Sequence, residues 1–183
     1  MNDGDRAVLE ILDWNVVERE LMRDCILLHT EVWANPEPLE LIIERRMRRT
    51  REPDSPQLSD HRLHVVRQDA RVIAMARSFR RTIACDGHPL AVMALASVCV
   101  DPRLRGRGLG EAVVRSAWER LDAAAAISFF QTGVPGFYER LGGRRIANPI
   151  VSSGRSFWEP HAMIAPGSAS WPAGIIDLLG DGW

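Results

Sequence analysis

The sequence contains no lysine, so all 23 of its basic residues are arginine. A P-loop is excluded, because that motif needs a lysine directly after its glycine-rich turn. The 24 acidic residues leave a net charge of −1. Such a balance gives no bulk attraction to nucleic acid or to an anionic membrane, and it argues against both as partners.

Cysteine is also scarce, with Cys25, Cys85 and Cys99 as the three examples. Their spacing matches no metal-binding pattern, and an odd number leaves one thiol unpaired in any disulfide scheme. We therefore expect reduced thiols, a cytoplasmic location and no metal site. No run of about 18 apolar residues is present to span a bilayer, and the first residues lack the apolar stretch of a secretory signal.

What is present is ordinary globular composition, with 46% hydrophobic and 26% charged residues in a chain of 183. This length fits one domain over residues 1–183. Hydrophobic periodicity and turn residues predict the order β-α-α-β-β-β-α-β-α-β-β, a mixed α/β fold. The expected segments are a strand at 7–12, helices at 17–32 and 39–49, a polar loop at 50–60, three strands within 61–100 divided at Gln68-Asp69 and Asp86-Gly87, a helix with Leu109, Val113, Ala117 and Leu121 on one face, a strand at 125–130, a helix from Pro135 to Gly142-Gly143, and a tail of strand and loop at 144–183.

The stretch DPRLRGRGLGEAVV, residues 101–114, places glycines and arginines where an apolar strand gives way to a helix. A helix N-terminus exposes unpaired N–H groups and the positive end of the helix dipole. Glycines let the backbone approach an anion closely, so the loop can form a nest for a phosphate or pyrophosphate. A solvated glycine-rich turn is the alternative, and the preceding antiparallel strands argue against a Rossmann fingerprint.

Two segments resemble motifs of the GCN5-related N-acetyltransferase (GNAT) superfamily. Val98-Cys99-Val100 followed by RGRGLG is similar to its acyl-CoA motif, V-x-V and then (R/Q)-x-x-G-x-(G/A), and GFYERLG is similar to its FYeklGF segment. The resemblance implies a single-domain α/β GNAT fold with a mixed, mostly antiparallel twisted sheet, flanking helices and splayed central strands. It also implies a bulge near Ala96-Ser97.

The resemblance further implies acetyl-CoA as the acyl donor. Backbone groups of the V-x-V strand would pair with the pantetheine arm, and amides of the glycine loop would hold the pyrophosphate. The coenzyme-binding residues implied in this way are Val98, Cys99, Val100, Arg105, Gly106, Arg107, Gly108, Leu109 and Gly110.

Tyr138, the only tyrosine, matches the family's general acid, which protonates the departing thiolate. The alternative is a phenol packed on a helix with its hydroxyl at the surface. Many relatives place a glutamate base just before V-x-V, but residues 95–97 here are Leu, Ala and Ser. Ordered waters, His88, His161 or an acidic residue of the tail remain as alternatives.

The ending WPAGIIDLLGDGW resembles that of aminoglycoside 2′-N-acetyltransferase-like members. Asp177, Asp181 and the carboxylate of Trp183 could form an anionic wall for a cationic amine, or the tail could simply close the core. The arginine-rich segment at 44–52 is typical of a solvated helix end, although it could also receive an acidic acceptor. Cys99 is expected to be a buried apolar thiol, because direct transfer needs no acyl-enzyme.

The sequence therefore predicts an N-acetyltransferase acting on the primary amine of a small molecule, such as an amino sugar or a polyamine-like compound. A CoA-binding sensor without turnover and an acyltransferase for peptide or protein N-termini remain alternatives. The resemblance is compatible with a homodimer.

Overall fold

The computed structural model describes residues 7–51, 58–152, 155–156 and 161–180. The helices are α1 (Arg19–Val32), α2 (Leu39–Arg51), α3 (Leu109–Trp118) and α4 (Pro135–Arg140), with the short 3-10 turns η2 (Trp14–Val16) and η3 (Pro102–Leu104). The strands are β1 (Val8–Asp13), β2 (Leu58–Gln68), β3 (Arg71–Cys85), β4 (His88–Val100), β5 (Ser128–Thr132), β6 (Arg144–Ile146), β7 (Ile150–Ser152), β8 (Arg155–Ser156), β9 (His161–Ala165) and β10 (Ile176–Asp177). No described helix is both long enough and apolar enough to cross a bilayer.

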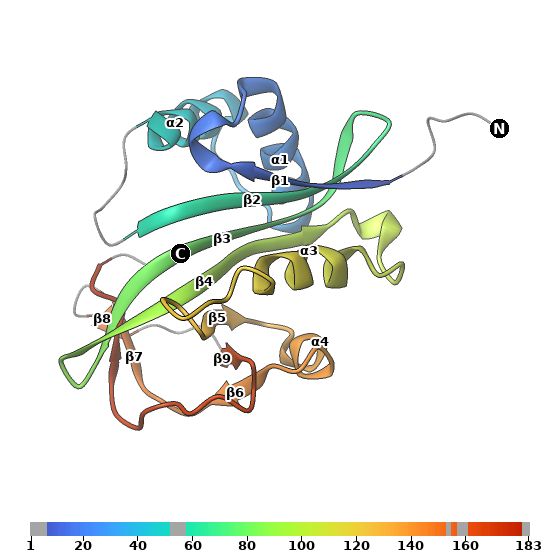
Figure 1. Cartoon of the computed structure of the whole chain (residues 1–183). Coiled ribbons are helices and arrows are strands. Elements are labelled where there is room, and N and C mark those ends of the chain that lie inside the picture. The colour runs from blue at the N-terminus through green and yellow to red at the C-terminus, as the bar shows by residue number, and fades with distance from the viewer. Residues whose placement is uncertain (1–6, 52–57, 153–154, 157–160, 181–183) are drawn as a thin grey trace.

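These strands form one sheet around the long β2-β3-β4 meander (Figure 1). From β6 the order runs β6-β9-β5-β4-β3. The other edge of β3 pairs with β2 along residues 71–81 and with β10 at residues 84–85. The pairs are antiparallel except for β4 with β5 and β7 with β10. The fold is thus a mixed α/β fold with an open, mostly antiparallel sheet, as the sequence predicts.

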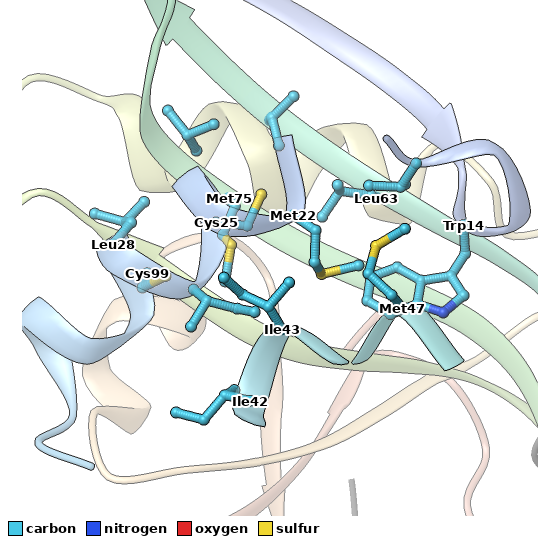
Figure 2. Packing of buried hydrophobic residues seen from close by; sticks show 14 residues of the cluster. Trp14, Met22, Cys25, Leu28, Ile42, Ile43, Met47, Leu63, Met75 and Cys99 are labelled. Atoms are coloured by element: carbon cyan, nitrogen blue, oxygen red, sulfur yellow. The ribbon is translucent and has the colours of Figure 1, made fainter. Parts of the chain in front are cut away.

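Neighbouring buried residues of a strand belong to different hydrophobic clusters, so the sheet has a core on both of its faces. Val65 and Met75 belong to the cluster that packs under α1 and α2, whereas their neighbours Val66 and Ala74 belong to the cluster under α3 and α4. Successive side chains of a strand point to opposite faces, so one strand can serve both clusters. Figure 2 shows the first cluster, in which residues of α1 and α2 lie against Leu63, Met75 and Cys99 of the sheet.

A third cluster closes the end of the sheet where the tail returns. Ile176 and Leu178 are fully buried there, and Trp171 stacks on Phe129 with ring centroids 5.6 Å apart. The Trp171 indole N–H also donates to Asn148 Oδ1 at 3.1 Å. This part of the tail therefore closes the core, the second of the two roles considered for it.

The predicted elements up to residue 145 are confirmed with shifted boundaries. The loop predicted at 50–60 overlaps both of its neighbours, because α2 continues to Arg51 and β2 begins at Leu58; residues 52–57 lie outside the described part of the chain. Leu121 lies beyond the end of α3, and the strand predicted at 125–130 is displaced to 128–132 because residues 122–125 form a turn. The tail was predicted with two strands, which is wrong: its described residues alone contribute five short ones.

A buried polar network joins α3 to the meander. His64, fully buried on β2, is hydrogen-bonded through Nδ1 to Ser116 Oγ and through Nε2 to Ser78 Oγ, each at 2.8 Å. Arg120 donates to the same Ser78 hydroxyl, and its guanidinium lies 2.7 Å from an Asp60 carboxylate oxygen. Burial, with the nearby charge of Arg120 as a smaller cause, lowers the pKa of His64 to about 4.

We expect the fold to lose stability as the pH falls from 6.5 to 4. The unfolded chain takes up a proton on His64 near pH 6.5 while the folded chain resists it, so the stabilisation is complete above pH 6.5. At pH 4.5 the loss from this one residue is about 2–3 kcal/mol. Urea unfolding at pH 7 and 4.5 measures it, and His64→Gln should reduce the difference. His88→Gln, at an exposed position, is the control; equal pH dependence of all three proteins would contradict the assignment.

Candidate functional site

The central strands β4 and β5 separate part of the way along their length. They pair at Met93↔Ser128 and Ala94↔Phe129, and the pairing stops there although both strands continue. Beyond this point two segments face a common cleft. They are residues 95–100 of β4 and residues 130–134, which include the end of β5. The predicted splay of the central strands is present and forms the walls of this cleft.

A β-bulge interrupts β4 at the point where the strands diverge. Met75 pairs with Cys99 and Arg77 with Ala96, so β4 accommodates one residue more than β3 across this step. Ser97 has a φ of +51°, in the left-handed region that non-glycine residues seldom adopt. A bulge leaves backbone groups outside the ladder and redirects them. It lies at the predicted position and is aimed at the cleft, because Ser97 is a lining residue.

The segment after β4 is held by a buried carboxylate. Asp101 accepts hydrogen bonds from the Arg103 backbone N–H at 2.9 Å and from the Arg103 guanidinium at 2.9 and 2.8 Å. These bonds cap η3 and hold the pKa of Asp101 below its usual value. The chain therefore leaves β4 in a defined direction before it enters the glycine-rich loop.

Glycine is required at two positions of that loop. Gly106 has a φ of +80°, and Gly108, the N-cap of α3, has a φ of +79°. A Cβ at either position would meet no atom within 4 Å, so the backbone there borders open space. Both glycines line the cleft, so the N-terminus of α3 borders it, which is the placement that the anion-binding interpretation of the sequence predicts.

The cleft has a volume of about 880 Å³ and gathers most of the predicted site residues. Val98, Cys99, Val100, Arg105, Gly106, Gly108, Leu109, Gly110 and Tyr138 all line it. Arg107 is exposed and is not a lining residue. Val32 and Trp33, at the end of α1, also border the cleft, and nothing in the sequence motifs indicated them.

Tyr138 is buried at the inner wall of the cleft, 6% exposed, so a phenol with its hydroxyl at the surface is not what the structure contains. Its ring packs against Phe130 and Phe137, with centroids 4.6 and 4.8 Å away. Burial raises the pKa of the phenol well above its ordinary value, and a hydrogen bond with Thr132 offsets only part of this shift. The hydroxyl therefore keeps its proton throughout the neutral range.

All three cysteines are free thiols and all are buried. Burial raises the pKa of Cys99 to about 12, and it raises the pKa of Cys25, in the neighbouring core, further still. Because the thiolate is the nucleophile, neither residue is prepared for covalent catalysis. Cys99 is the buried apolar thiol that the sequence predicts.

No described residue of the tail lines the cleft. Asp177 pairs with Ala84, seven residues along β3 from Arg77, which corresponds to roughly 20 Å at strand spacing. Its carboxylate accepts the Leu179 N–H at 2.8 Å. Asp181 and Trp183 lie outside the described residues. The described part of the predicted anionic wall is thus absent from the site.

Neither of the two histidines considered as bases lines the cleft. His88 sits in the exposed hairpin turn at the far end of β4. His161 pairs in register with Thr132, a residue of the cleft, but does not line the cleft itself.

A second, smaller pocket lies beneath α1 and α2 and was not predicted. It has a volume of about 60 Å³ and adjoins the cleft at Ser97, the one described residue that lines both. Its polar lining includes His29, Thr30, Asn35, Arg45, Arg46 and Arg77. Burial, and then the charges of Arg46 and Arg77, lower the pKa of His29 to about 4, so its imidazole is neutral at pH 7.

Strands that diverge beside a bulge, with a glycine turn opening a helix at their ends, define the fold of the GNAT acyltransferases. The chain belongs to this family, because the model described as "Acetyltransferase (GNAT) domain" matches residues 15–145.

Solved structures agree with this fold. A GNAT family N-acetyltransferase from Escherichia coli (YhbS) in complex with CoA has a TM-score of 0.65 at 17% identity, over 98% of this chain and 93% of that one. Glucosamine-6-phosphate N-acetyltransferase from Arabidopsis thaliana gives 0.57 at 18% identity, over 82% and 99%. A GCN5-related N-acetyltransferase from Kribbella flavida gives 0.58 at 20% identity over 76% of this chain, which spans only 33% of that protein.

Proposed function

We propose that the protein transfers an acyl group, in the simplest case acetyl, from acyl-CoA directly to the primary amine of a small molecule. The observation that carries this proposal is the cleft itself, in which the N-terminus of α3, a strand bulge and a buried phenol border one space. Each of these features suits one part of an acyl-CoA.

The glycine loop suits the pyrophosphate. Gly106 and Gly108 leave room for the phosphates to approach the backbone, and the α3 N-terminus supplies N–H donors and the positive end of a dipole. Arg105, exposed beside them on the cleft wall, adds charge. Val98 and Val100 lie on the unpaired side of β4, where the pantetheine amides can add as a further strand.

The bulge suits the thioester. A backbone N–H released at Ser97 can donate to the thioester oxygen as negative charge develops there. Tyr138 then donates its proton to the departing sulfur, and burial keeps that proton in place until it is needed.

The amine attacks the thioester in its neutral form, which equilibrium with the bulk solvent supplies before attack. His29 lines the small pocket beyond Ser97, but a group with a pKa near 4 is too weak to deprotonate an alkylammonium of pKa ~10. An amine that binds already neutral needs no carboxylate base in the cleft.

The acceptor is a small molecule rather than a chain terminus, and an amino sugar is one candidate class. The named substrate of the similar Arabidopsis thaliana structure, glucosamine-6-phosphate, supports this class. We place the reaction in the cytoplasm, where three free cysteines and the thiol of CoA remain reduced.

CoA is expected to raise the melting temperature by several degrees at concentrations well above its dissociation constant, because it binds the folded state alone. A thiol-release assay with acetyl-CoA and a panel of amino sugars, diamines, amino acids and peptides is then expected to show turnover. Stabilisation by CoA without turnover on any amine would favour the sensor alternative. No stabilisation by CoA would contradict the proposal as a whole.

A further inference from the structure

Thr132, the last residue of β5, lies beside the phenol of Tyr138 at the wall of the cleft. Both residues line the cleft, and Thr132 is 7% exposed. Phe130, two positions earlier on the same strand, packs against the Tyr138 ring with centroids 4.6 Å apart. Because alternate residues of a strand share a face, Thr132 projects toward the same helix, α4. Its hydroxyl is hydrogen-bonded to Tyr138.

A second partner of Thr132 leaves its hydroxyl proton available to Tyr138. The backbone N–H of Val134 donates to Thr132 Oγ1 at 3.0 Å. Because a backbone N–H can only donate, the Thr132 oxygen is the acceptor of that bond and keeps its own proton for another group. When Thr132 donates this proton to the Tyr138 oxygen, the proton of the phenol is left free to point into the cleft.

Proton transfer from Tyr138 to the departing sulfur leaves a phenolate in a buried position. The O–H bond of the phenol breaks, an S–H bond forms on CoA, and the negative charge passes from sulfur to the phenol oxygen. Burial makes such an anion costly, because it loses most of its hydration. A hydroxyl that donates to the phenolate oxygen lowers this cost, and the phenol regains its proton from solvent after the products leave.

The charged side chains of the cleft do not stabilise the phenolate in place of this hydroxyl. The described lining includes Arg105, Glu111 and Arg140 as its charged residues, and none of them contributes to the pKa of Tyr138. Burial is the largest cause that raises this pKa and Cys99 adds to it, whereas the hydrogen bond from the end of β5 lowers it. Burial raises the pKa of Cys99 itself to about 12, so its thiol is uncharged in the neutral range.

We propose that Thr132 is a positioning residue for Tyr138: its hydroxyl donates to the phenol oxygen, directs the phenol proton to the sulfur and stabilises the phenolate that remains. The proposal rests on the proposed acyl transfer, in which Tyr138 is the acid. Thr132 acts through Tyr138, so its contribution to the rate depends on the presence of the phenol hydroxyl. The Val134 N–H fixes the Thr132 oxygen in place for this role.

Thr132→Val removes the hydroxyl and keeps the shape of the side chain. It should lower kcat in the thiol-release assay by about 10- to 100-fold, the range for a hydrogen bond to a charged group, and change the dissociation constant of CoA by less than about threefold. Thr132→Ser retains a hydroxyl and should recover most of kcat. Thr82→Val, at a half-buried position of β3 that pairs with Ala91 away from the cleft, is the control and should leave kcat unchanged.

A double-mutant cycle separates this role from a structural one. Thr132→Val also removes the acceptor of the Val134 N–H, and a structural effect of that loss would persist without the phenol hydroxyl. In the Tyr138→Phe background, Thr132→Val should therefore lower kcat by less than about threefold. An equal fall in both backgrounds would overturn the proposal, as would a wild-type kcat in Thr132→Val. A weaker affinity for CoA at unchanged kcat would also overturn it, because Thr132 would then act on the coenzyme.

A measurement without turnover separates this proposal from the proposed function. Tyr138 is the only tyrosine of the chain, so biosynthetic incorporation of a fluorinated tyrosine labels this position alone. Fluorine withdraws electrons and lowers the pKa of the phenol, and fluorine NMR follows its ionisation in the folded protein. Thr132→Val should raise the pKa of the labelled phenol by about one or more, whereas Thr132→Ser and Thr82→Val should leave it near that of the labelled wild type.

The two measurements fail independently. A raised pKa in Thr132→Val supports the hydrogen bond to the phenolate even if no amine is acetylated. An unchanged pKa in Thr132→Val refutes the role of Thr132 even in a protein that acetylates an amine, and it leaves the proposed acyl transfer in place.

Discussion

Gly108→Glu is expected to abolish CoA binding, with a rise of at least 100-fold in the dissociation constant. Gly108 is the N-cap of α3 and borders the cleft in open space, so its replacement places a carboxylate where the pyrophosphate is to bind. The new charge repels the phosphates and fills the nest that the glycines leave open. Loss of the CoA-dependent rise in melting temperature, checked by calorimetric titration, is the measurement.

The chain offers a matched control in Gly87→Glu. Gly87 has a φ of +81° and, like Gly108, open space around the position of a Cβ, but it lies in the β3–β4 hairpin turn at the far end of the sheet. Both variants carry the same left-handed strain, about 1–2 kcal/mol, and the same added charge. CoA affinity retained in Gly87→Glu and lost in Gly108→Glu assigns the effect to the loop. A CoA dissociation constant that stays within a few-fold of the wild-type value in both variants would refute the glycine loop as the pyrophosphate site.

Tyr138→Phe is expected to lower kcat by 100-fold or more while the dissociation constant of CoA changes by less than about threefold. The phenyl ring keeps the packing against Phe130 and Phe137, and the substitution removes the hydroxyl together with its hydrogen bond to Thr132. General acids of this kind contribute about 10²–10⁴-fold. Stopped-flow or steady-state thiol release gives kcat, and titration calorimetry gives the affinity.

Two comparisons separate catalysis by Tyr138 from a structural role. With acyl donors whose thiols are more acidic, the leaving group needs a proton less, so the rate difference between wild type and Tyr138→Phe should shrink. Since burial raises the pKa of Tyr138 well above 10, ionisation of this residue should produce no fall in wild-type kcat below pH 10. A kcat unchanged by the substitution would remove Tyr138 from the mechanism.

The parts of the fold that the sequence predicts are those whose signals are local. The β2-β3-β4 meander is marked by turn residues, and Asp69 and Gly87 do adopt positive φ at its two turns. The strands of the tail could not be predicted in this way. The described ones are two to five residues long and pair with distant partners, as Ile176 does with Cys85. Segments that short carry no periodicity, and tertiary packing alone selects their conformation.

The same distinction applies to the site. The glycine loop and Tyr138 lie in contiguous motifs, so their positions could be predicted from residue order. The pocket beneath α1 and α2 is assembled from residues far apart in the chain, and Arg77 in particular belongs to a stretch with four arginines that looks solvent-exposed. Only the covering helices reveal that this arginine is buried, and His29 was overlooked because a single histidine on a helix is rarely informative.

The small pocket and the cleft are built from different parts of the chain, which has a consequence for how such a protein can change. Apart from Ser97, the lining of the small pocket comes entirely from residues 14–77, while the cleft draws mainly on residues 95–140. Substitutions in the small pocket and substitutions in the cleft therefore fall in different parts of the gene, Ser97 apart, so one set of lining residues can change while the other stays the same.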